Sequence, residues 1–268
     1  MRNPDASAGR RGDGASTPAT VGAAAQVFVA DLDALGLAPE DAHHLGQVLR
    51  LRTGEIVVAG DGAGRWRACR FVAADGAPRA PVLEPDGPVA TSERTEPEVT
   101  VAFVPVKGER PEWVVQKLTE TGVDRVVVLE SRRSVVRWEG ERGARAIERL
   151  RRVAHEAAAQ SRRAWLPEVI GVMDLPSLSA RLGPGALAVA QLGGEPPTMS
   201  VPAVAVGPEG GWDPSETTGH RLVGLGPTVL RAETAAVAAG LLLCALRGGL
   251  VRPCDGRQDT SGPGTNGP

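Results

Sequence analysis

The chain has 268 residues, of which 42% are hydrophobic and 23% charged, and its formal net charge is −2. This length corresponds to about two domains of a globular protein with a hydrophobic core. The longest apolar run, 235–246, is shorter than the roughly 20 residues that span a bilayer, and the first twenty residues lack the apolar core of a signal peptide. Cys69, Cys244 and Cys254 lie far apart, which argues against a disulfide framework or a structural zinc and favours the cytoplasm.

Positive charge is concentrated in two stretches of the chain. Residues 125–163 contain eleven arginines and five glutamates, and residues 50–70 contain five arginines and two acids. Two basic regions on a nearly neutral chain favour a polyanion such as nucleic acid as a partner, although a solvated arginine-rich surface explains the counts equally well. Only two lysines, Lys107 and Lys117, stand among 28 arginines. They mark either positions where a guanidinium does not fit or the chance survival of surface lysines.

The first third of the sequence predicts a small β domain between polar segments. Residues 1–20 and 251–268 are poor in apolar side chains, so we expect disordered tails. Residues 21–90 alternate short β-like runs with glycine turns and include one short helix at 42–49, which predicts a mostly β, barrel-like domain. The acidic, proline-containing stretch that follows predicts a linker at 91–98.

From residue 99 to 250 the pattern changes to strands and helices in alternation. Short apolar runs predict strands at 99–105, 123–129, 186–192, 203–207 and 228–230. Between them, helices are predicted at 109–121, 141–160, 213–223 and 233–246. Apolar strands separated by helices are typical of a buried parallel sheet with helices on both faces, so this second domain is expected to be α/β.

The sharpest local signal is a strand, a glycine-rich loop and a helix start within 204–216. Asp213 and Glu216 have the spacing of a capping box at the start of the helix. Gly210 and Gly211 allow positive φ and a close approach of the backbone to a ligand. A loop at the carboxyl end of a parallel strand often binds a small molecule, although it can equally be structural. The segment matches neither the dinucleotide pattern nor the phosphate-loop pattern.

Two further segments carry charges that need an explanation. Residues 225–246 combine a Gly-Pro turn, a very short strand and a helix of small and apolar residues, which suits close packing against another backbone. Arg231 and Glu233 stand where this apolar helix begins, so they should have partners or a function. A basic helix ends at Arg162 and Arg163, and charges of that sign also suit a helix C-terminus without any function.

Five segments stand in order along the chain: HHLGQVLRLRTGE, KGERPEWVVQKLTETGVDRV, AHEAAAQSRRAWLPEV, VGPEGGWDPSE and LGPTVLRAETAAVAAG. Together they resemble the bacterial family that methylates N3 of a uridine in 16S ribosomal RNA, part of the SPOUT superfamily of knotted methyltransferases. The likeness covers about residues 25–250. It implies a PUA-like RNA-binding barrel at 21–90 and an α/β domain with a deep C-terminal trefoil knot at 99–250. It also implies a homodimer that holds S-adenosylmethionine in the knot, and a reaction without a metal.

On this resemblance, three sets of residues are candidates for the site. The cofactor-binding set is Leu192, Gly207, Pro208, Glu209, Gly210, Gly211, Leu225, Gly226, Val229, Leu230, Arg231, Ala232, Glu233 and Thr234. The RNA-binding set is Arg50, Arg52, Arg65, Arg67, Lys107, Lys117, Arg132, Arg133, Arg162 and Arg163. The catalytic candidates are Arg231 and Arg163, as cations beside the uracil oxygens, and Glu209. Glu209 or Glu233 would accept the N3 proton or orient an arginine.

Three positions depart from the residues usual in the family. Thr228 stands in place of Arg, Thr121 in place of Leu, and Arg162 in place of Gly. The missing arginine at 228 makes Arg231 the better candidate for the chemistry, with an Arg231–Glu233 pair that only fixes the loop as the alternative. Two other functions stay open: a SPOUT enzyme acting on another ribosomal or transfer RNA base, and a non-catalytic RNA-binding factor in ribosome assembly. A nicotinamide-dependent oxidoreductase is disfavoured because the dinucleotide pattern is missing.

Overall fold

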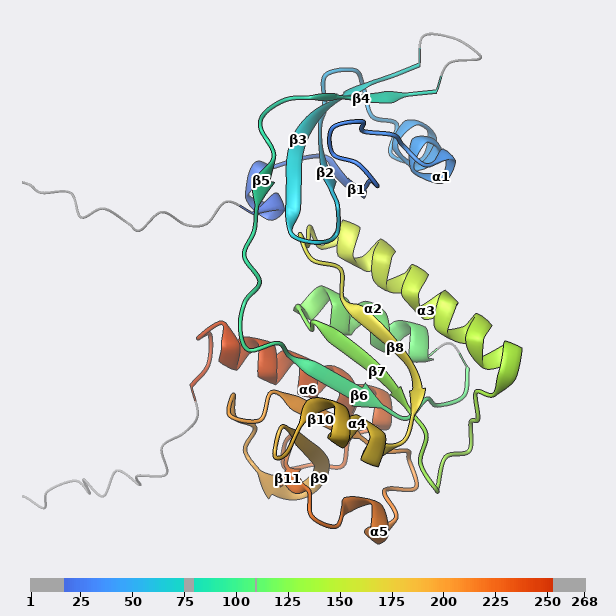
Figure 1. Cartoon of the computed structure of the whole chain (residues 1–268), viewed down its shortest axis with the longest axis vertical. Helices are drawn as coiled ribbons and strands as arrows, with labels where there is room; N and C mark the ends of the chain where they lie inside the picture. The colour runs from blue at the N-terminus through green and yellow to red at the C-terminus, as the bar shows by residue number, and fades with distance from the viewer. Residues whose placement is uncertain (1–16, 75–79, 109, 253–268) are drawn as a thin grey trace, which may run out of the picture.

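The computed structural model describes residues 17–74, 80–108 and 110–252, arranged around two sheets (Figure 1). The first sheet contains β1 (Ala25–Phe28), β2 (Ile56–Gly60), β3 (Arg65–Val72), β4 (Val82–Pro85) and β5 (Ala90–Thr91). Its order is β1-β2-β3-β4, with β5 also paired to β3, and only the β1–β2 pair is parallel. A 3₁₀ turn (Pro18–Val21), helix α1 (Pro39–His43) and a π-helical turn (His44–Val48) complete this region. The expected small, mostly β domain is thus a mixed five-stranded sheet.

The second sheet has six strands, all parallel, in the order β11-β9-β10-β6-β7-β8. Its strands are β6 (Thr100–Phe103), β7 (Arg125–Leu129), β8 (Glu168–Met173), β9 (Leu187–Glu195), β10 (Ala203–Val206) and β11 (Arg221–Val223). Its helices are α2 (Arg110–Thr121), α3 (Gly140–Gln160), α4 (Leu175–Leu182), α5 (Pro214–Thr217) and α6 (Ala232–Arg247). The parallel α/β domain predicted from the apolar strands is confirmed. In the described part of the chain, no helix has the length and apolar character needed to cross a membrane.

The two faces of the parallel sheet pack against different helices. Side chains on β6 alternate: Val101 and Phe103 lie in the core formed with α2, α3 and α6, while Ala102 and Val104 lie in the core formed with α4. This alternation follows from the two-residue period of a strand. Because both faces are covered, every residue of β6 and β10 is buried, which explains why these strands appear in the sequence as continuous apolar runs.

Three predictions about local structure need correction. The helix predicted at 213–223 ends at Thr217, because Gly219 has a φ of +83° and residues 221–223 form β11 beside β9. The strand predicted at 228–230 is part of a loop. Helix α4 was not predicted at all, although Asp174 caps it by accepting a hydrogen bond from the Ser177 amide at 2.9 Å. Of the two predicted tails, residues 1–16 and 253–268 lie outside the described residues.

The turn after α3 joins the two domains. Arg162 has a φ of +60°, in the left-handed region that favours glycine, which fits the glycine usual at this position in the related family. Its Nη2 donates hydrogen bonds to the carbonyl oxygens of Ala23 and Ala24 at 3.0 and 2.9 Å. Gln26, from β1, donates through Nε2 to the Arg163 carbonyl oxygen at 2.7 Å. The side chain of Arg162 therefore links this turn to the β domain.

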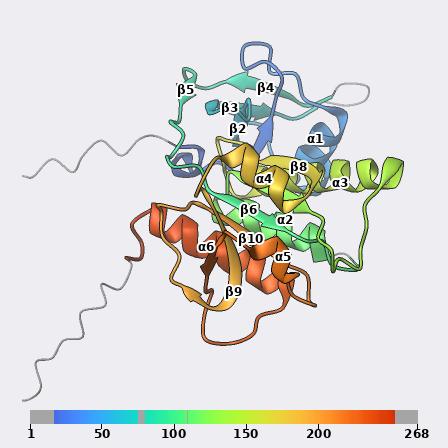
Figure 2. The same cartoon turned by 60° about the horizontal axis from the view of Figure 1, so that its bottom comes forward.

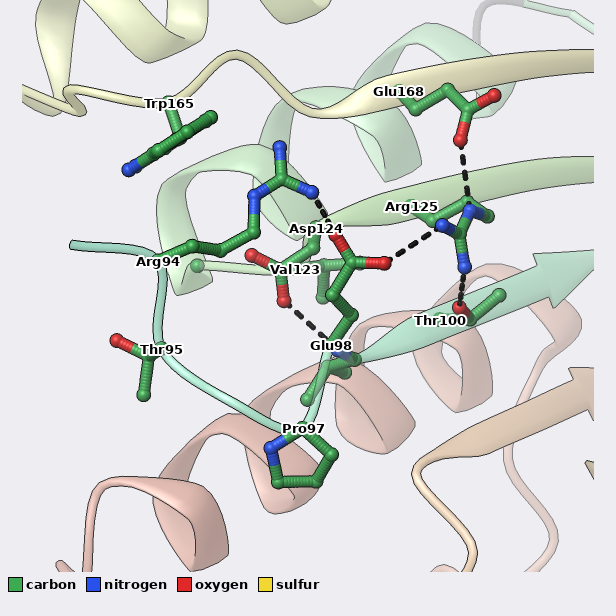
Figure 3. Close-up of polar contacts among 12 residues, drawn as sticks. Arg94, Thr95, Pro97, Glu98, Thr100, Val123, Asp124, Arg125, Trp165 and Glu168 are labelled. Atoms are coloured by element: carbon green, nitrogen blue, oxygen red, sulfur yellow. Dashed lines mark hydrogen bonds and ion pairs between the residues drawn. The ribbon is translucent and has the colours of Figure 1, made fainter. Parts of the chain in front are cut away.

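Trp165 extends the same contact to the segment between the domains (Figure 3). Its Nε1 donates to the Ser92 carbonyl oxygen at 2.9 Å, and the Arg94 guanidinium lies over its ring, 4.4 Å from the centroid. A Cβ added at Gly64 would meet the Trp165 ring at 2.4 Å, so the backbone of the β domain touches the indole directly. Arg94 also forms an ion pair with Glu98. The segment predicted as a linker is therefore in contact with both domains.

A buried carboxylate, Asp124, joins the helices to the start of the sheet. Its Oδ2 accepts a hydrogen bond from the Val99 amide at 2.8 Å, as Figure 3 shows, and it forms an ion pair with Arg247 at the end of α6. Arg163 Nη2 lies 3.8 Å from its Oδ1. Only 9% of the Asp124 side chain is exposed, against 10% and 12% for the two arginines. Burial lowers the pKa of Arg163 from its usual value.

We predict that Asp124→Ala lowers the free energy of unfolding by about 3–5 kcal/mol, because it leaves two guanidiniums buried without their carboxylate. The control is Glu141→Ala, which breaks an exposed Arg145–Glu141 pair and should change stability by less than about 1 kcal/mol. Urea denaturation of both variants measures the difference. Equal stabilities for the two variants would contradict the role given to Asp124.

Candidate active site

A pocket of about 750 Å³ opens at the carboxyl ends of β9 and β10. Three segments supply most of its lining: residues 190–192 of β9, the glycine loop (207–211) and the 225–231 loop that leads into α6. Residues of α5 and of the start of α6 also line it. The chain order of the strands changes direction beside it, between β10 and β6, since β7 and β8 lie on one side of β6 while β10 and β9 lie on the other. Parallel sheets bind ligands at such a switch point. We call it the switch-point pocket; Figure 2 shows β9, α5 and α6 around this end of the domain.

The glycine loop is shaped by its neighbours as well as by its glycines. A Cβ added at Gly207 would lie 2.9 Å from the Trp212 ring, so the indole packs directly on this backbone. Gly211 has a φ of +70°, whereas a Cβ at Gly210 would meet nothing within 4 Å. At the end of the loop, Asp213 forms the predicted capping box of α5. Its hydrogen bonds with Ser215 hold the pKa of this carboxyl below its usual value.

Arg231 and Glu233 do not pair with each other. Glu233 is 12% exposed and forms an ion pair with Arg110, whose Nη1 lies 3.3 Å from Glu233 Oε1. The same Nη1 lies 3.7 Å from Oε1 of Glu209 in the glycine loop. Arg231 is the N-cap residue of α6, lines the switch-point pocket, and has no side-chain hydrogen bond or ion pair with the described residues. The alternative in which Glu233 neutralises Arg231 and only fixes the loop is therefore wrong.

Most of the predicted cofactor-binding residues lie together. Eleven of the fourteen line the switch-point pocket: Leu192, Gly207, Pro208, Glu209, Gly211, Leu225, Gly226, Val229, Leu230, Arg231 and Ala232. Gly210, Glu233 and Thr234 are not part of its lining. Eight further residues line it that were not predicted: Ala190, Gln191, Val206, Trp212, Pro214, Thr217, Thr228 and Ala235. Trp212 could have been found, because a large aromatic directly after two glycines is unusual in a chain with only 3% aromatic residues.

Arg163 lies elsewhere. Its Nη1 donates to the carbonyl oxygens of Thr119 and Val123 at 2.9 and 2.7 Å, and its Nη2 faces Asp124. It is not part of the lining of the switch-point pocket. A guanidinium that is 12% exposed and engaged in this way stabilises the fold. Arg163 is therefore not brought together with Arg231 and Glu209, and its charge is engaged inside the fold.

The predicted RNA-binding set is also reduced by internal contacts. Arg67 donates to the carbonyl oxygens of Leu32 and Gly87 at 3.2 and 2.7 Å, and Arg162 binds the β domain. Lys117 forms an ion pair with Glu120 at 2.8 Å, on the same helix. The exposed members of the set are Arg50, Arg52, Arg65, Lys107, Arg132 and Arg133.

Fewer of the positive charges at 125–163 are available to a ligand than the number of arginines in the sequence suggests. Six of its eleven arginines form ion pairs: Arg125, Arg133, Arg145, Arg149, Arg151 and Arg163. Arg133 also donates to the Gly210 carbonyl oxygen at 3.3 Å. Much of this basic stretch therefore holds elements of the protein to one another.

Comparison with known proteins places the chain in a family. The RNA methyltransferase domain family matches residues 93–243, and the RNA methyltransferase PUA domain family matches residues 37–76. Ribosomal RNA small subunit methyltransferase E of Mycobacterium tuberculosis is 37% identical over 219 residues, which cover 75% of this chain and 82% of that protein.

Two solved structures have the same overall fold. A probable rRNA-methyltransferase of Porphyromonas gingivalis superposes with a TM-score of 0.71 at 27% identity, covering 85% of this chain and all of that one. A methyltransferase of Legionella pneumophila in complex with its bound cofactor SAM gives a TM-score of 0.66 at 27% identity, covering 82% and 96% of the two chains. Because a relative that is 37% identical is covered over 82% of its length, this chain belongs to the ribosomal RNA small subunit methyltransferase E family.

Proposed function

We propose that this RNA methyltransferase transfers the methyl group of S-adenosylmethionine to N3 of a uridine in the 16S ribosomal RNA of the small subunit. The observation that carries the proposal is the switch-point pocket, because eleven residues expected to bind the cofactor line a single cavity. Its volume of about 750 Å³ suits a ligand of this size. The name of the relatives gives small-subunit ribosomal RNA as their target. In this proposal the reaction takes place in the cytoplasm, with the ribosomal RNA.

The residues of the pocket fit the cofactor chemically. Trp212, Leu225 and Leu230 offer apolar surface for an adenine ring. A Cβ built at Gly226 meets nothing within 4 Å, so a ligand can approach the backbone there closely. S-adenosylmethionine, when bound, supplies an electrophilic methyl group on a sulfonium. Gly226, with a φ of +139°, takes a conformation that favours glycine at the edge of this surface.

Arg231 and Glu209 are the two ionisable side chains of the pocket with which the protein would act on the base. Uridine N3 carries a proton and becomes nucleophilic when that proton leaves. The Arg231 guanidinium, free of an internal partner among the described residues, stabilises the negative charge that spreads onto the uracil oxygens. Glu209 is exposed in the glycine loop and accepts the N3 proton, while Arg110 holds its carboxylate near the pocket.

We also propose that the chain around β9, β11 and α6 forms the deep trefoil knot. Close backbone approach between β9 and β11 supports this, because a Cβ added at Gly194 would lie 2.5 Å from the Val223 carbonyl carbon. The protein acts as a homodimer through α6 and the pocket loops, where Leu241 is 54% exposed and Val229 is 83% exposed. An apolar surface of this kind favours a protein partner.

The β domain supplies affinity for RNA in this proposal. Arg50, Arg52 and Arg65 are exposed on it, and the turn at 162–166 fixes it against the methyltransferase domain. Exposed arginines bind phosphates without reading a sequence. The β domain therefore holds the substrate while the switch-point pocket performs the reaction.

Mass mapping tests the function directly. Small subunits from cells that lack this gene are incubated with the purified protein and S-adenosylmethionine, and the digested 16S RNA is sequenced by mass spectrometry. We expect one added methyl group on N3 of a single uridine. A methyl group on another base, or on transfer RNA in a parallel reaction, would instead support one of the alternative SPOUT activities.

We predict that Gly207→Ala weakens S-adenosylmethionine binding at least about tenfold, since its Cβ would displace Trp212 from the pocket wall. The matched control is Gly210→Ala, whose Cβ meets nothing within 4 Å and should leave affinity within about twofold. Calorimetry measures both dissociation constants, and circular dichroism checks the fold. Equal affinities for the two variants would show that the glycine loop does not shape the cofactor site.

We predict that Arg231→Ala lowers single-turnover methylation at least about 100-fold, the scale for losing one preorganised donor to a developing charge. Its dissociation constant for S-adenosylmethionine should barely change. The control is Arg221→Ala, which removes an exposed arginine of β11 that pairs with Glu195 outside the pocket. A near-parental rate for Arg231→Ala would exclude a role in the chemical step.

A further inference from the structure

A second cavity lies at the same edge of the parallel sheet, outside the switch-point pocket. It has a volume of about 920 Å³ and opens between the segment after β7, helix α4 and helix α5. Ser215, Glu216 and Thr218 line it, whereas Pro214 and Thr217 line the switch-point pocket. One turn of helix therefore separates the two cavities. We call this second one the α4–α5 cavity.

Two arginines at the α4–α5 cavity have charge available for a ligand. Arg132 and Arg137 line it and are exposed, and neither guanidinium makes a hydrogen bond or ion pair with the described residues. Many other arginines of this domain are paired, as described above. Two free guanidiniums beside a cavity of this size suit a ligand that carries a phosphate.

The rest of the lining suits a nucleotide better than a lone phosphate. The carboxylates of Glu130, Asp174 and Glu216 also line the cavity, and they would repel an anion placed deep inside it. Carboxylate and hydroxyl oxygens accept hydrogen bonds from the amino and imino groups of a nucleobase. The Ser179 hydroxyl and a ring nitrogen of His220 can accept such bonds in the lining as well. A base inside the cavity, with its phosphate at the arginines, satisfies both kinds of lining group.

The α4–α5 cavity is mechanically tied to the glycine loop. Glu216 accepts a hydrogen bond from the Arg132 amide at 3.0 Å and another from the Asp213 amide at 3.1 Å. Arg133 reaches across to the Gly210 carbonyl oxygen at 3.3 Å. These contacts hold the segment that carries the free arginines at a fixed distance from the switch-point pocket. Enzymes that modify a base commonly read the nucleotides beside it.

We propose that the α4–α5 cavity binds an unpaired nucleotide of the RNA next to the methylated uridine, with its base inside and its phosphate on Arg132 and Arg137. This inference rests on the proposed function. It assigns the cavity a part in choosing the RNA, because only one turn of α5 separates it from the pocket in which the uridine would be methylated.

Two variants test the cavity, one by charge and one by volume. Arg137→Ala removes a phosphate contact, and Ala180→Phe fills the cavity from an exposed position on α4. Their controls are Arg142→Ala and Ala144→Phe, the same changes at exposed positions of α3 that do not line the cavity. The measurements are the KM for small subunits, the dissociation constant for protein-free 16S RNA by filter binding, and that for S-adenosylmethionine.

We expect both cavity variants to raise the KM and the RNA dissociation constant at least about fivefold, as loss of a charge-assisted contact would. For Arg137→Ala the slope of log affinity against log salt should fall by about 0.7, the value for one phosphate on a single strand, while Ala180→Phe should keep the parental slope. The controls should stay within about twofold, and cofactor affinity should not change.

Two outcomes would overturn the inference. If the parental protein methylates small subunits while both cavity variants match their controls, the cavity has no part in RNA binding. If the KM for subunits rises but affinity for protein-free RNA does not, the cavity binds a ribosomal protein. A parental protein that fails to methylate N3 would count against the proposed function instead, and the RNA-binding measurements would still decide the role of the cavity.

Discussion

The position of α6 depends on the buried charge of Asp124. Arg247, at the end of this helix, binds that carboxylate and donates to the Gly122 carbonyl oxygen at 2.9 Å. A buried guanidinium is stable only where all its donors find acceptors, so the helix has one favourable position along its axis. The opposite end of α6 begins at Arg231 in the switch-point pocket. A structural ion pair at one edge of the sheet thereby fixes a functional group at the other.

The edge with the pockets is held by contacts between segments that are distant in the sequence. Arg110 connects the start of α2 to Glu209 in the glycine loop and to Glu233 in the first turn of α6. Arg133 connects the segment after β7 to the same loop. Since the glycine loop has little side-chain bulk of its own, these guanidiniums limit its movement. They keep the loop close to the shape that binding requires, which lowers the entropy lost when a ligand binds.

How far the sequence predicts the structure depends on the range of the interactions. The capping box at Asp213 is local, and it places the start of α5 correctly. The end of α5 was missed because it depends on β11 pairing with β9, about thirty residues earlier in the chain. The internal role of Arg163 was missed for the same reason, because its buried partner Asp124 lies far from it in the sequence. Eleven pocket residues were named from the family resemblance, which carries information on distant contacts that local patterns lack. The partner of Glu233, which lies on another helix, could not be named in this way.

Arginine serves two separate purposes in this chain, and burial separates them. Arg125, Arg163 and Arg247 each bind several acceptors at once, which the planar, five-donor guanidinium can do and an ammonium cannot match. These residues account for part of the charge counted in the sequence and leave none of it for a ligand. Arg132, Arg137 and Arg231 have no such internal partners among the described residues, and all three lie at cavities on the carboxyl edge of the sheet. Net charge therefore gives little indication of where RNA binds, whereas a guanidinium that both lacks an internal partner and lines a cavity, as these three do, marks a place where a polyanion would be held.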